Sequence, residues 1–315
     1  MTRKVLVTGA MGQIGSELTL ELRRRYGSDN VLATDLREPG GKLKETGPCG
    51  VLDVTDRTAV FSYISEHGIN TVYHLAAILS ATGEKKPALC WNVNMNGSIN
   101  IMDAAVQLKL GTVVIPSSIA AFGPETPRFD TPQETVLKPK TMYGVTKVCG
   151  ELLGDYYVKK LGADIRGLRY PGIISSETPP GGGTTDYAVD IFYQAVEKGE
   201  YTCFVKEDTM LPMMYMPDCI KATIDLAEAE KDGLVHSCEY NLGALSFTAG
   251  ELAAEIRKHI PGFKVSYEPD FRQGIADTWP ASIDDSAARE EWGWSPDWDL
   301  ASMTKDMIEK LRQRL

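Results

Sequence analysis

Three polar residues have the types and the spacing needed to take a proton from an alcohol. Tyr143 and Lys147 are four residues apart, which places them one turn apart on the same face of a helix. A phenol with a pKa near 10 supplies almost no tyrosinate at neutral pH, but a nearby ammonium lowers that pKa. Ser118 would hydrogen-bond the substrate oxygen as it becomes a carbonyl. The set predicts alcohol oxidation with hydride transfer to a nicotinamide, with Tyr143 as the general base assisted by Lys147 and Ser118.

Many amphipathic helices have a tyrosine and a lysine at this spacing. Whether the pair indicates catalysis therefore depends on the elements around it. A glycine-rich turn follows the first apolar run, Val5–Val7, and leads into a helix whose apolar residues recur every four positions. Glycines let the backbone approach a pyrophosphate, which the free N–H groups of the helix N-terminus then bind. The residues of this turn that we expect to contact a dinucleotide are Gly9, Gly12, Gln13, Ile14 and Gly15.

An acidic residue at the end of the second apolar run predicts which dinucleotide is bound. Asp35 stands where a carboxylate accepts hydrogen bonds from the adenosine ribose hydroxyls and repels a 2′-phosphate. This favours NAD over NADP, although Arg37 weakens the exclusion. The alternative is that the glycines form only a turn and that Asp35 is a loop carboxylate.

Further cofactor contacts are predicted where later strands end. Asp53 would reach the adenine amino group with Val54 against the ring, and the alternative is that Asp53 is a solvated loop carboxylate. Small residues after the strand Thr71–Leu75 would let the backbone pass under the cofactor, and we interpret His74 as a strand histidine with satisfied hydrogen bonds. The cofactor contacts predicted in these segments are Leu36, Asp53, Val54, Leu75, Ala76 and Ala77.

Short apolar runs alternate with amphipathic stretches through the first half of the chain. Such runs suit strands buried on both faces, and strand–helix–strand repeats imply a right-handed, parallel, doubly wound sheet. After about residue 170 the pattern becomes less regular, beginning with a loop rich in proline and glycine. We predict an α/β Rossmann fold with a dinucleotide-binding domain over 1–170, to which the chain can return, and a smaller, mainly substrate-binding lobe over 171–315.

The composition disfavours several classes of protein. Hydrophobic residues make up 43% of the 315 positions and charged residues 24%, which is typical of a globular chain. The net charge of −10 opposes binding to nucleic acid and to anionic membranes. The beginning, Met1–Val5, lacks the apolar segment of a signal peptide, so we expect a cytoplasmic protein. The six cysteines and four histidines show no metal-ligand spacing, and no metal is expected.

The glycine-rich turn and the serine, tyrosine and lysine set together resemble the extended short-chain dehydrogenase/reductase family, which contains nucleotide-sugar epimerases. The resemblance covers essentially the whole chain and implies that Ser118, Tyr143 and Lys147 are catalytic, with Tyr143 and Lys147 also reaching the nicotinamide ribose. The segment Arg169–Gly172 resembles the one that covers the nicotinamide in that family. The implied cofactor contacts then include Tyr170 and Pro171 within this segment and Ile173 directly after it.

One segment differs from the nucleotide-sugar enzymes of this family. Those enzymes usually hold the diphosphate with an arginine in a stretch that here resembles Leu211–Asp218, where the basic residue is missing. Without a guanidinium the site loses its strongest phosphate ligand, which favours a smaller and less anionic substrate. A nucleotide-sugar 4-epimerase or dehydratase is the alternative, and an NAD-sensing module without catalysis is the third hypothesis.

Residues 77–84, 181–188 and 278–280 resemble one branch of the family, the short-chain-type L-threonine 3-dehydrogenases. The resemblance implies oxidation of the 3-hydroxyl of L-threonine by NAD. Hydroxyls and backbone groups of a glycine-rich loop are able to hold the zwitterion. The implied substrate contacts are Ser80, Ser118, Tyr143, Thr184, Thr185 and, as a candidate pocket wall, Trp279.

The loop from Pro179 to Thr185 contains three consecutive glycines, and we predict that it is an exposed, mobile lid that closes over the substrate. A flexible surface linker is the alternative. Asp186 would either pair with the substrate ammonium or cap the helix that begins at Tyr187, and capping is the commoner use of such a residue.

Assembly is predicted mainly from the family, in which a four-helix contact commonly forms a homodimer. The helices expected over 92–108 and 143–161 would supply the apolar residues of that contact. The alternative is that these side chains only face the sheet. They are Met95, Ile99, Met102, Leu152 and Tyr156.

Overall fold

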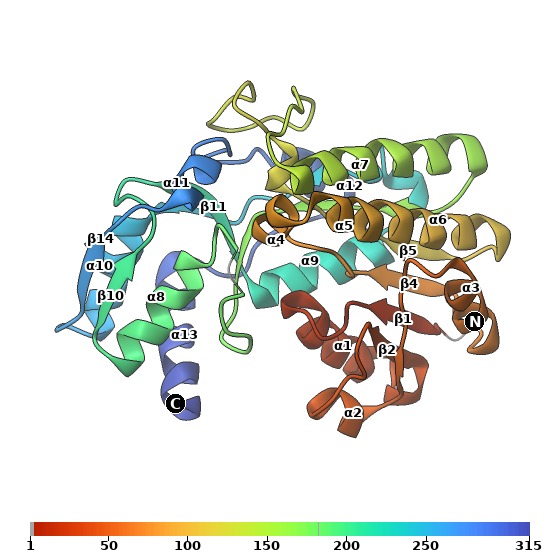
Figure 1. Ribbon diagram of the computed structural model, residues 1–315, viewed down its shortest axis with the longest axis horizontal. Coiled ribbons are helices and arrows are strands. Elements are labelled where there is room, and N and C mark those ends of the chain that lie inside the picture. Colours follow the sequence, from red (N-terminus) through yellow and green to blue (C-terminus); the bar gives the residue numbers. More distant parts are fainter. Residues whose placement is uncertain (1–2, 182) are drawn as a thin grey trace.

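A six-stranded parallel sheet forms the centre of the first half of the chain in the computed structural model, which describes residues 3–181 and 183–315 (Figure 1). The strand order matches a doubly wound sheet, because β1 lies in the middle and the chain proceeds outward first to one side and then to the other. In spatial order the strands are β3 (Cys49–Val51), β2 (Val31–Asp35), β1 (Val5–Thr8), β4 (Thr71–His74), β5 (Thr112–Val114) and β7 (Ile165–Arg166).

Each central strand is buried on both faces, as its short apolar sequence predicts. Leu6 and Val72 face one hydrophobic core, whereas Val5, Val7 and Tyr73 face the other. This alternation follows from the two-residue period of a strand. Both faces of the sheet therefore need a layer of helices.

Helices cover the two faces as separate layers. The first core is closed by α3 (Arg57–Glu66), α6 (Gly97–Gln107) and α7 (Met142–Leu161). The second is closed by α1 (Gln13–Tyr26) and by α9 (Met216–Glu228), which packs beside α1 although it comes much later in the chain. The α/β Rossmann prediction is thus confirmed.

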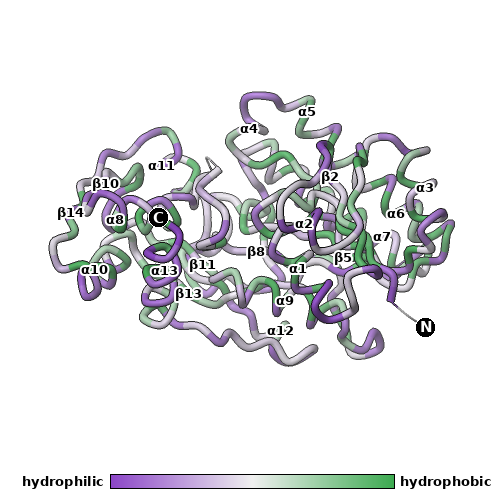
Figure 2. Tube along the Cα trace, turned by 90° about the horizontal axis from the view of Figure 1, so that it is seen from below, coloured by the Kyte–Doolittle hydropathy of each residue, from purple (hydrophilic) through white to green (hydrophobic). Residues whose placement is uncertain are grey.

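A second lobe lies beside the sheet, on the left in Figure 1. Its core joins three helices to short strands, and Figure 2 shows apolar stretches recurring inside both lobes. The three helices are α8 (Tyr187–Glu197), α10 (Ala249–His259) and α13 (Leu300–Arg314). The strands outside the central sheet are β6 (Ser117–Ser118), β8 (Leu168–Tyr170), β9 (Gly172–Ile174), β10 (Glu200–Cys203), β11 (Met210–Tyr215), β12 (Tyr240–Asn241), β13 (Leu245–Thr248) and β14 (Lys264–Tyr267).

The remaining helices are short and lie mostly in connections. None of the helices described is long and apolar enough to cross a membrane. The division at residue 170 stays a prediction, and α9 is a later segment that packs on the first half of the chain. The short helices are α2 (Lys42–Thr46), α4 (Ser80–Lys85), α5 (Pro87–Trp91), α11 (Phe271–Ala276) and α12 (Ser286–Trp292), with a π-helical turn over Asn92–Asn96.

Candidate active site

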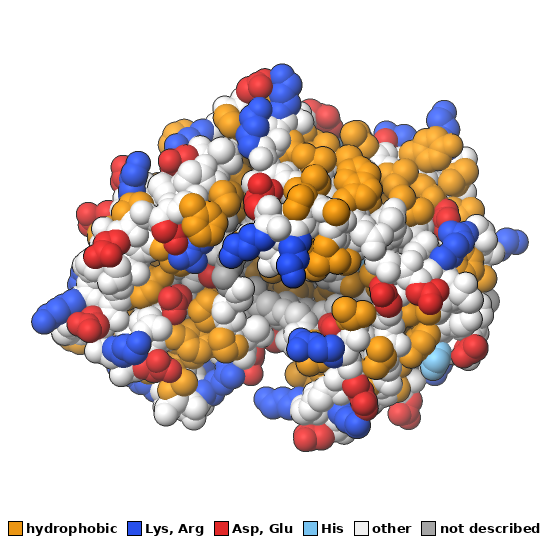
Figure 3. Space-filling view, in the orientation of Figure 1, with side chains coloured by type: hydrophobic (Ala, Val, Ile, Leu, Met, Phe, Trp, Pro, Cys, Tyr) orange, Lys and Arg blue, Asp and Glu red, His pale blue; other side chains and the backbone are white. Residues whose placement is uncertain are grey.

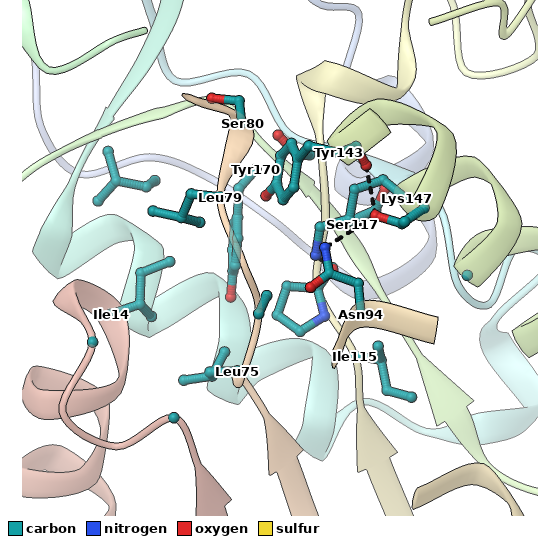
Figure 4. A pocket seen from close by; sticks show the side chains of 18 of the residues that line it. Ile14, Leu75, Leu79, Ser80, Asn94, Ile115, Ser117, Tyr143, Lys147 and Tyr170 are labelled. Carbon is teal, nitrogen blue, oxygen red and sulfur yellow. Dashed lines mark hydrogen bonds between the residues drawn. The ribbon is translucent and has the colours of Figure 1, made fainter. Parts of the chain in front are cut away.

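A cavity of about 270 Å³ lies between the lobes, at the carboxyl end of the parallel strands. The hollow is visible from outside near the centre of Figure 3. In Figure 4, Tyr143 and Lys147 approach it from one side, and Ile14 and Leu79 from the other. Most of the predicted site residues line it: Gly9, Gly12, Gln13, Ile14, Gly15, Leu75, Ala76, Ala77, Ser80, Ser118, Tyr143, Lys147, Tyr170, Pro171, Ile173, Thr184, Thr185 and Trp279.

The glycine-rich turn is packed so tightly that two of its positions admit no side chain. A Cβ on Gly9 would lie 2.6 Å from the backbone nitrogen of Ala76, and Gly9 also has a φ of +67°. A Cβ on Gly15 would lie 2.2 Å from the carbonyl oxygen of Gly9. No side chain caps the N-terminus of α1, which begins at Gln13, so its first N–H groups face the cavity as an anion site. The turn is a cradle for a pyrophosphate.

The two predicted adenosine acids lie outside the cavity wall. Asp35 ends β2, where its carboxylate accepts hydrogen bonds from the backbone nitrogens of Met11 at 3.0 Å and Leu36 at 2.8 Å. These bonds fix the carboxylate beside the glycine-rich turn. Asp53 is exposed and accepts from the backbone and hydroxyl of Thr55, while Val54 is buried. The adenosine contacts of Asp35, Leu36, Asp53 and Val54 stay predictions.

Tyr143 stands in the first turn of α7, and the sequence around it fixes the start of that helix. The Thr141 hydroxyl accepts from the backbone nitrogen of Gly144 at 3.0 Å, and the Glu84 carboxylate accepts from that of Met142 at 2.6 Å. A Cβ on Gly144 would lie 2.2 Å from the carbonyl oxygen of Ala120, so this glycine lets α7 approach the segment after β6. The close approach allows the Ser118 hydroxyl to hydrogen-bond the phenol of Tyr143.

Lys147 lies one turn further along α7. Its ammonium donates to the carbonyl oxygen of Pro116 at 2.6 Å and lies 5.3 Å from the centre of the Tyr143 ring. Desolvation lowers the pKa of Lys147 to about 8, against the charges of Glu151 and Cys90, which raise it. Desolvation also raises the pKa of Tyr143 to about 12, while the bond from Ser118 lowers it. In the ligand-free cavity a phenolate therefore needs additional positive charge nearby.

Thr184 lines the same cavity and carries an unpaired hydroxyl. The residue is only 1% exposed, and its Oγ1 has no hydrogen-bond partner. A buried hydroxyl without a partner is costly, which is typical of a position that awaits a ligand. Ser80, at the start of α4, and Trp279 are also buried in the wall, whereas Thr185 is half-buried. The prediction of an exposed lid is therefore wrong for Thr184, which packs inward from the loop; Gly182 lies outside the described residues.

Asp186 braces the glycine-rich loop. Its carboxylate accepts from the backbone nitrogens of Gly181 at 2.7 Å and Gly183 at 2.8 Å. It makes no capping bond to α8, so the helix-cap interpretation is wrong, because the carboxylate turns back to the loop before the helix.

Residues 5–243 match the model of the NAD dependent epimerase/dehydratase family. The chain belongs to this family. It is 51% identical, over 99% of its length and 98% of the relative, to an uncharacterised epimerase/dehydratase of Staphylococcus haemolyticus. Among solved structures, L-threonine dehydrogenase from Clostridium difficile superimposes with a TM-score of 0.97 at 50% identity, covering 99% of this chain and 98% of that one. A monomeric L-threonine 3-dehydrogenase from a metagenome database, in its apo form, gives 0.95 at 50% identity, covering 98% and 99%.

Membership of the family confirms NAD as the cofactor. The cradle fits it, because Gly9 and Gly15 leave the backbone bare beside the uncapped start of α1. The glycine-rich turn, Gln13 and Ile14 are placed to hold the pyrophosphate, and Tyr143 and Lys147 line the same cavity.

A buried asparagine was missed by the sequence reasoning. Asn94 lies in the π-helical turn, where its side chain accepts from the backbone nitrogen of Ile78 at 2.8 Å and donates to the Ile78 carbonyl at 3.1 Å. It also donates to the hydroxyl of Thr146 at 3.0 Å, between Tyr143 and Lys147 on α7. Asn94 therefore ties the segment before Ser80 to α7, the helix that carries Tyr143 and Lys147. The available signal was an amide in an otherwise apolar helix face, and π-turns are frequent at functional sites.

His74 differs from its interpretation as a satisfied strand residue. Nδ1 is 2.8 Å from the hydroxyl of Thr8, but Nε2 is buried without a partner, and the residue lines the cavity. Burial lowers the pKa of His74 to about 3, so the ring is neutral. The interpretation is right for Nδ1 only. The neighbouring strand β1 supplies the Thr8 hydroxyl to that nitrogen and no partner to Nε2.

The residues predicted for a dimer contact separate into two groups. Met95 and Met102 are buried within this chain, so their assignment to an intermolecular contact is wrong. Leu152 and Tyr156 on α7 are 66% and 52% exposed, and Ile99 is intermediate. Exposed apolar side chains gather over α5 and α7 at the upper right of Figure 3.

Proposed function

We propose that the protein oxidises the 3-hydroxyl of L-threonine to 2-amino-3-oxobutanoate with NAD. One observation carries the proposal: Ser118, Tyr143, Lys147 and Thr184 line one cavity, and among its described lining residues Lys147 is the only lysine and there is no arginine. Thr184 adds a buried hydroxyl that has no hydrogen-bond partner. Such a wall suits a small amino acid better than a nucleoside diphosphate. The similarity to L-threonine dehydrogenases at 50% identity supports the same substrate.

The chemistry assigned to the chain is removal and stabilisation of one proton. NAD, when bound, supplies the hydride acceptor. Tyr143 takes the hydroxyl proton of the substrate, and Ser118 donates a hydrogen bond to the oxygen as it becomes a carbonyl. Because desolvation raises the pKa of Tyr143, the ammonium of Lys147 is needed to stabilise the phenolate. No protein group needs to form a covalent bond with the substrate.

The charged end of L-threonine is assigned to other residues of the cavity wall. Thr184, Thr185 and Ser80 present hydroxyls to its carboxylate and ammonium, and Trp279 closes the side of the cavity. The Asp186 carboxylate holds the glycine-rich loop that carries Thr184. On this proposal residues 1–170 bind mainly the cofactor, and residues 171–315 supply most of the substrate contacts.

The proposal is tested by following NADH absorbance with L-threonine, and by product analysis with UDP-sugars. We expect NADH to form with L-threonine and no UDP-sugar to be interconverted. Epimerised or dehydrated UDP-sugar without NADH formation from L-threonine would instead identify the alternative function in the same family.

A homodimer remains part of the proposal, although one similar structure is of a monomeric enzyme. The exposed side chains of Leu152 and Tyr156 support a contact along α7. Light scattering at micromolar concentration tests it: twice the mass of the chain is expected, and Leu152→Glu should reduce that to one chain. A single-chain mass for the unmodified protein contradicts the dimer.

A further inference from the structure

A buried ion pair stands one helical turn beyond Lys147. Arg169 on β8 donates to the two carboxylate oxygens of Glu151 on α7, from Nε at 3.0 Å and from Nη2 at 2.8 Å. Both side chains are at most 5% exposed. Arg169 also donates to the carbonyl of Gln133 and to the side chain of Asn241. Replacing a buried pair of this kind with apolar residues often leaves a protein equally stable, so stability alone is a weak reason for its presence.

The carboxylate is connected to the catalytic residues through a single strand segment. The hydroxyl of Ser117 donates to Glu151, the carbonyl of Pro116 accepts from Lys147, and Ser118 bonds to Tyr143. Residues 116–118 are therefore attached, one each, to Lys147, Glu151 and Tyr143. These three residues of α7 follow one another at intervals of four positions. Residues at this spacing share one helix face. Movement of any one attachment would move the other two.

Lys147 is faced by charged and titratable groups from several elements. Burial makes the His74 ring neutral and raises the pKa of the Cys90 thiol, so neither carries charge near neutral pH. Glu151 raises the pKa of Lys147, and its charge is in turn opposed by Arg169. The groups concerned are Tyr143 and Glu151 on α7, His74 on β4, Cys90 on α5, Arg169 on β8 and Glu239 next to β12, which interacts with both Arg169 and Glu151.

We propose that Glu151 and Arg169 form a positioning pair for the reaction: Glu151 fixes residues 116–118 against α7 and places a negative charge one helical turn from Lys147, while Arg169 limits that charge. Glu151 lines the cavity wall, whereas Arg169 lies outside the lining. The inference rests on one part of the proposed function, the assignment of Lys147 to the nicotinamide ribose. It does not depend on which alcohol is oxidised.

The test compares Glu151→Gln with Arg169→Met, which remove opposite charges from the same pair. The readout is the pH midpoint at which NAD affinity falls, measured by tryptophan fluorescence, because the Lys147 ammonium would hydrogen-bond the ribose more strongly than the neutral amine does. The charge of Glu151 raises the pKa of Lys147. Since a nearby charge shifts a pKa by about 1–3 units, we expect Glu151→Gln to lower the midpoint by about one unit and Arg169→Met to raise it. A structural defect alone would weaken binding in both variants without moving the midpoints in opposite directions.

The chain offers a matched control in a second buried pair. Arg166 donates to both oxygens of Asp164 at 2.8 Å, and neither residue lines the cavity. Asp164→Asn should leave the midpoint unchanged. A midpoint for Glu151→Gln within about 0.2 unit of the unmodified protein would overturn the proposal, since a facing charge moves a pKa further than that.

Two additional measurements separate the possible outcomes. Ser117→Ala removes one attachment and no charge, so we expect kcat to fall about tenfold without a midpoint shift, and an unchanged kcat would overturn the role of the strand segment. If Arg169→Met does not fold, Glu151→Gln decides the question. If the unmodified protein leaves L-threonine unchanged but the midpoint of Glu151→Gln still moves, the proposed substrate fails and the positioning pair stands.

Discussion

Two glycine-rich segments face the same cavity, and their glycines are there for different reasons. In the turn Gly9–Gly15, a Cβ on Gly15 would lie 2.2 Å from backbone oxygen. In the loop before α8, a Cβ on Gly181 would meet nothing within 4 Å, and the nearest atoms to one on Gly183 belong to the Asp186 side chain, at 2.8 Å. The first segment uses glycine to bring backbone close to backbone. The second uses it to let a side chain hold the loop, so a similar composition does not imply a similar role.

On the proposed function, the contrast extends to how the two halves of the site would recognise their ligands. The cofactor side presents backbone N–H groups at the start of α1, whereas the substrate side presents hydroxyls such as that of Thr184. Where closely packed backbone binds the ligand, an added side chain disrupts the fold of the segment. Where a hydroxyl binds the ligand, its removal costs one hydrogen bond and leaves the fold intact. Substitutions in the two segments should therefore differ in size and in kind.

The largest expected effect is the difference between Gly15→Ala and Gly181→Ala in NAD affinity and in the free energy of unfolding. The added methyl on Gly15 collides with backbone atoms, so NAD binding should become undetectable and the free energy of unfolding should fall by about 1–3 kcal/mol or more. Gly181→Ala has open space and should change stability by less than about 0.5 kcal/mol. Calorimetric NAD titration and urea unfolding measure both effects. Equal results for the two variants would break the comparison.

Tyr143→Phe tests the residue that faces both halves of the cavity. Turnover should fall by about 10² or more while the NAD affinity changes little, because the phenol acts on substrate and Lys147 still holds the ribose. In the unmodified protein kcat/KM should rise from neutral to alkaline pH as the phenolate fraction grows. The rise should end when Lys147, whose pKa desolvation lowers to about 8, loses its proton.

The control for this prediction is Tyr156→Phe, an exposed tyrosine on the same helix, which should keep full activity. A Tyr143→Phe variant that retained more than roughly a tenth of the turnover would show that another group is the base. A flat pH profile for the unmodified protein would lead to the same conclusion.

The same contrast explains what the sequence could and could not predict. The glycine-rich turn, the spacing of Tyr143 and Lys147, and the alternation of strands and helices are local patterns, and the fold followed from them. The pairing of Glu151 with Arg169 and Asn241 joins distant parts of the chain and has no local signal. The inward orientation of Thr184 is decided by how the loop packs.

Helix faces near the sheet were also beyond the sequence pattern. Met95 and Met102 lie on buried faces, whereas Leu152 and Tyr156 lie on an exposed one. All four positions are apolar, so the periodicity indicates a helix without stating which apolar stripe meets the sheet and which meets solvent. Only the three-dimensional packing separates them.

Asp35→Ala should reduce kcat/KM with NAD by less than Gly15→Ala reduces NAD binding, because it removes one side chain from the cofactor side of the site, where the other contacts come from the backbone. Hydrogen bonds to a charged group contribute about 1.5–3 kcal/mol, so kcat/KM with NAD should fall by roughly 10- to 150-fold, while use of NADP should improve. Glu38→Ala, which removes an exposed carboxylate paired with Lys44, is the matched control and should change neither value. Equal kcat/KM for NAD and NADP in the unmodified protein would contradict the role of Asp35.

Thr184→Val should have the smallest effect and the most specific one. The substitution keeps the shape of the side chain and removes a hydroxyl that is buried and unpaired in the ligand-free protein. We therefore expect the KM for L-threonine to rise by about 2- to 12-fold, the value of one neutral hydrogen bond, while the KM for NAD stays the same. The melting temperature of the free protein should stay equal or rise, since a desolvated polar group has been removed.

Thr178→Val, in the chain before the glycine-rich loop and outside the cavity wall, is the control and should leave both constants unchanged. A lower melting temperature with an unchanged KM would show that Thr184 only packs the loop, and the second glycine-rich segment would then have no role in substrate binding.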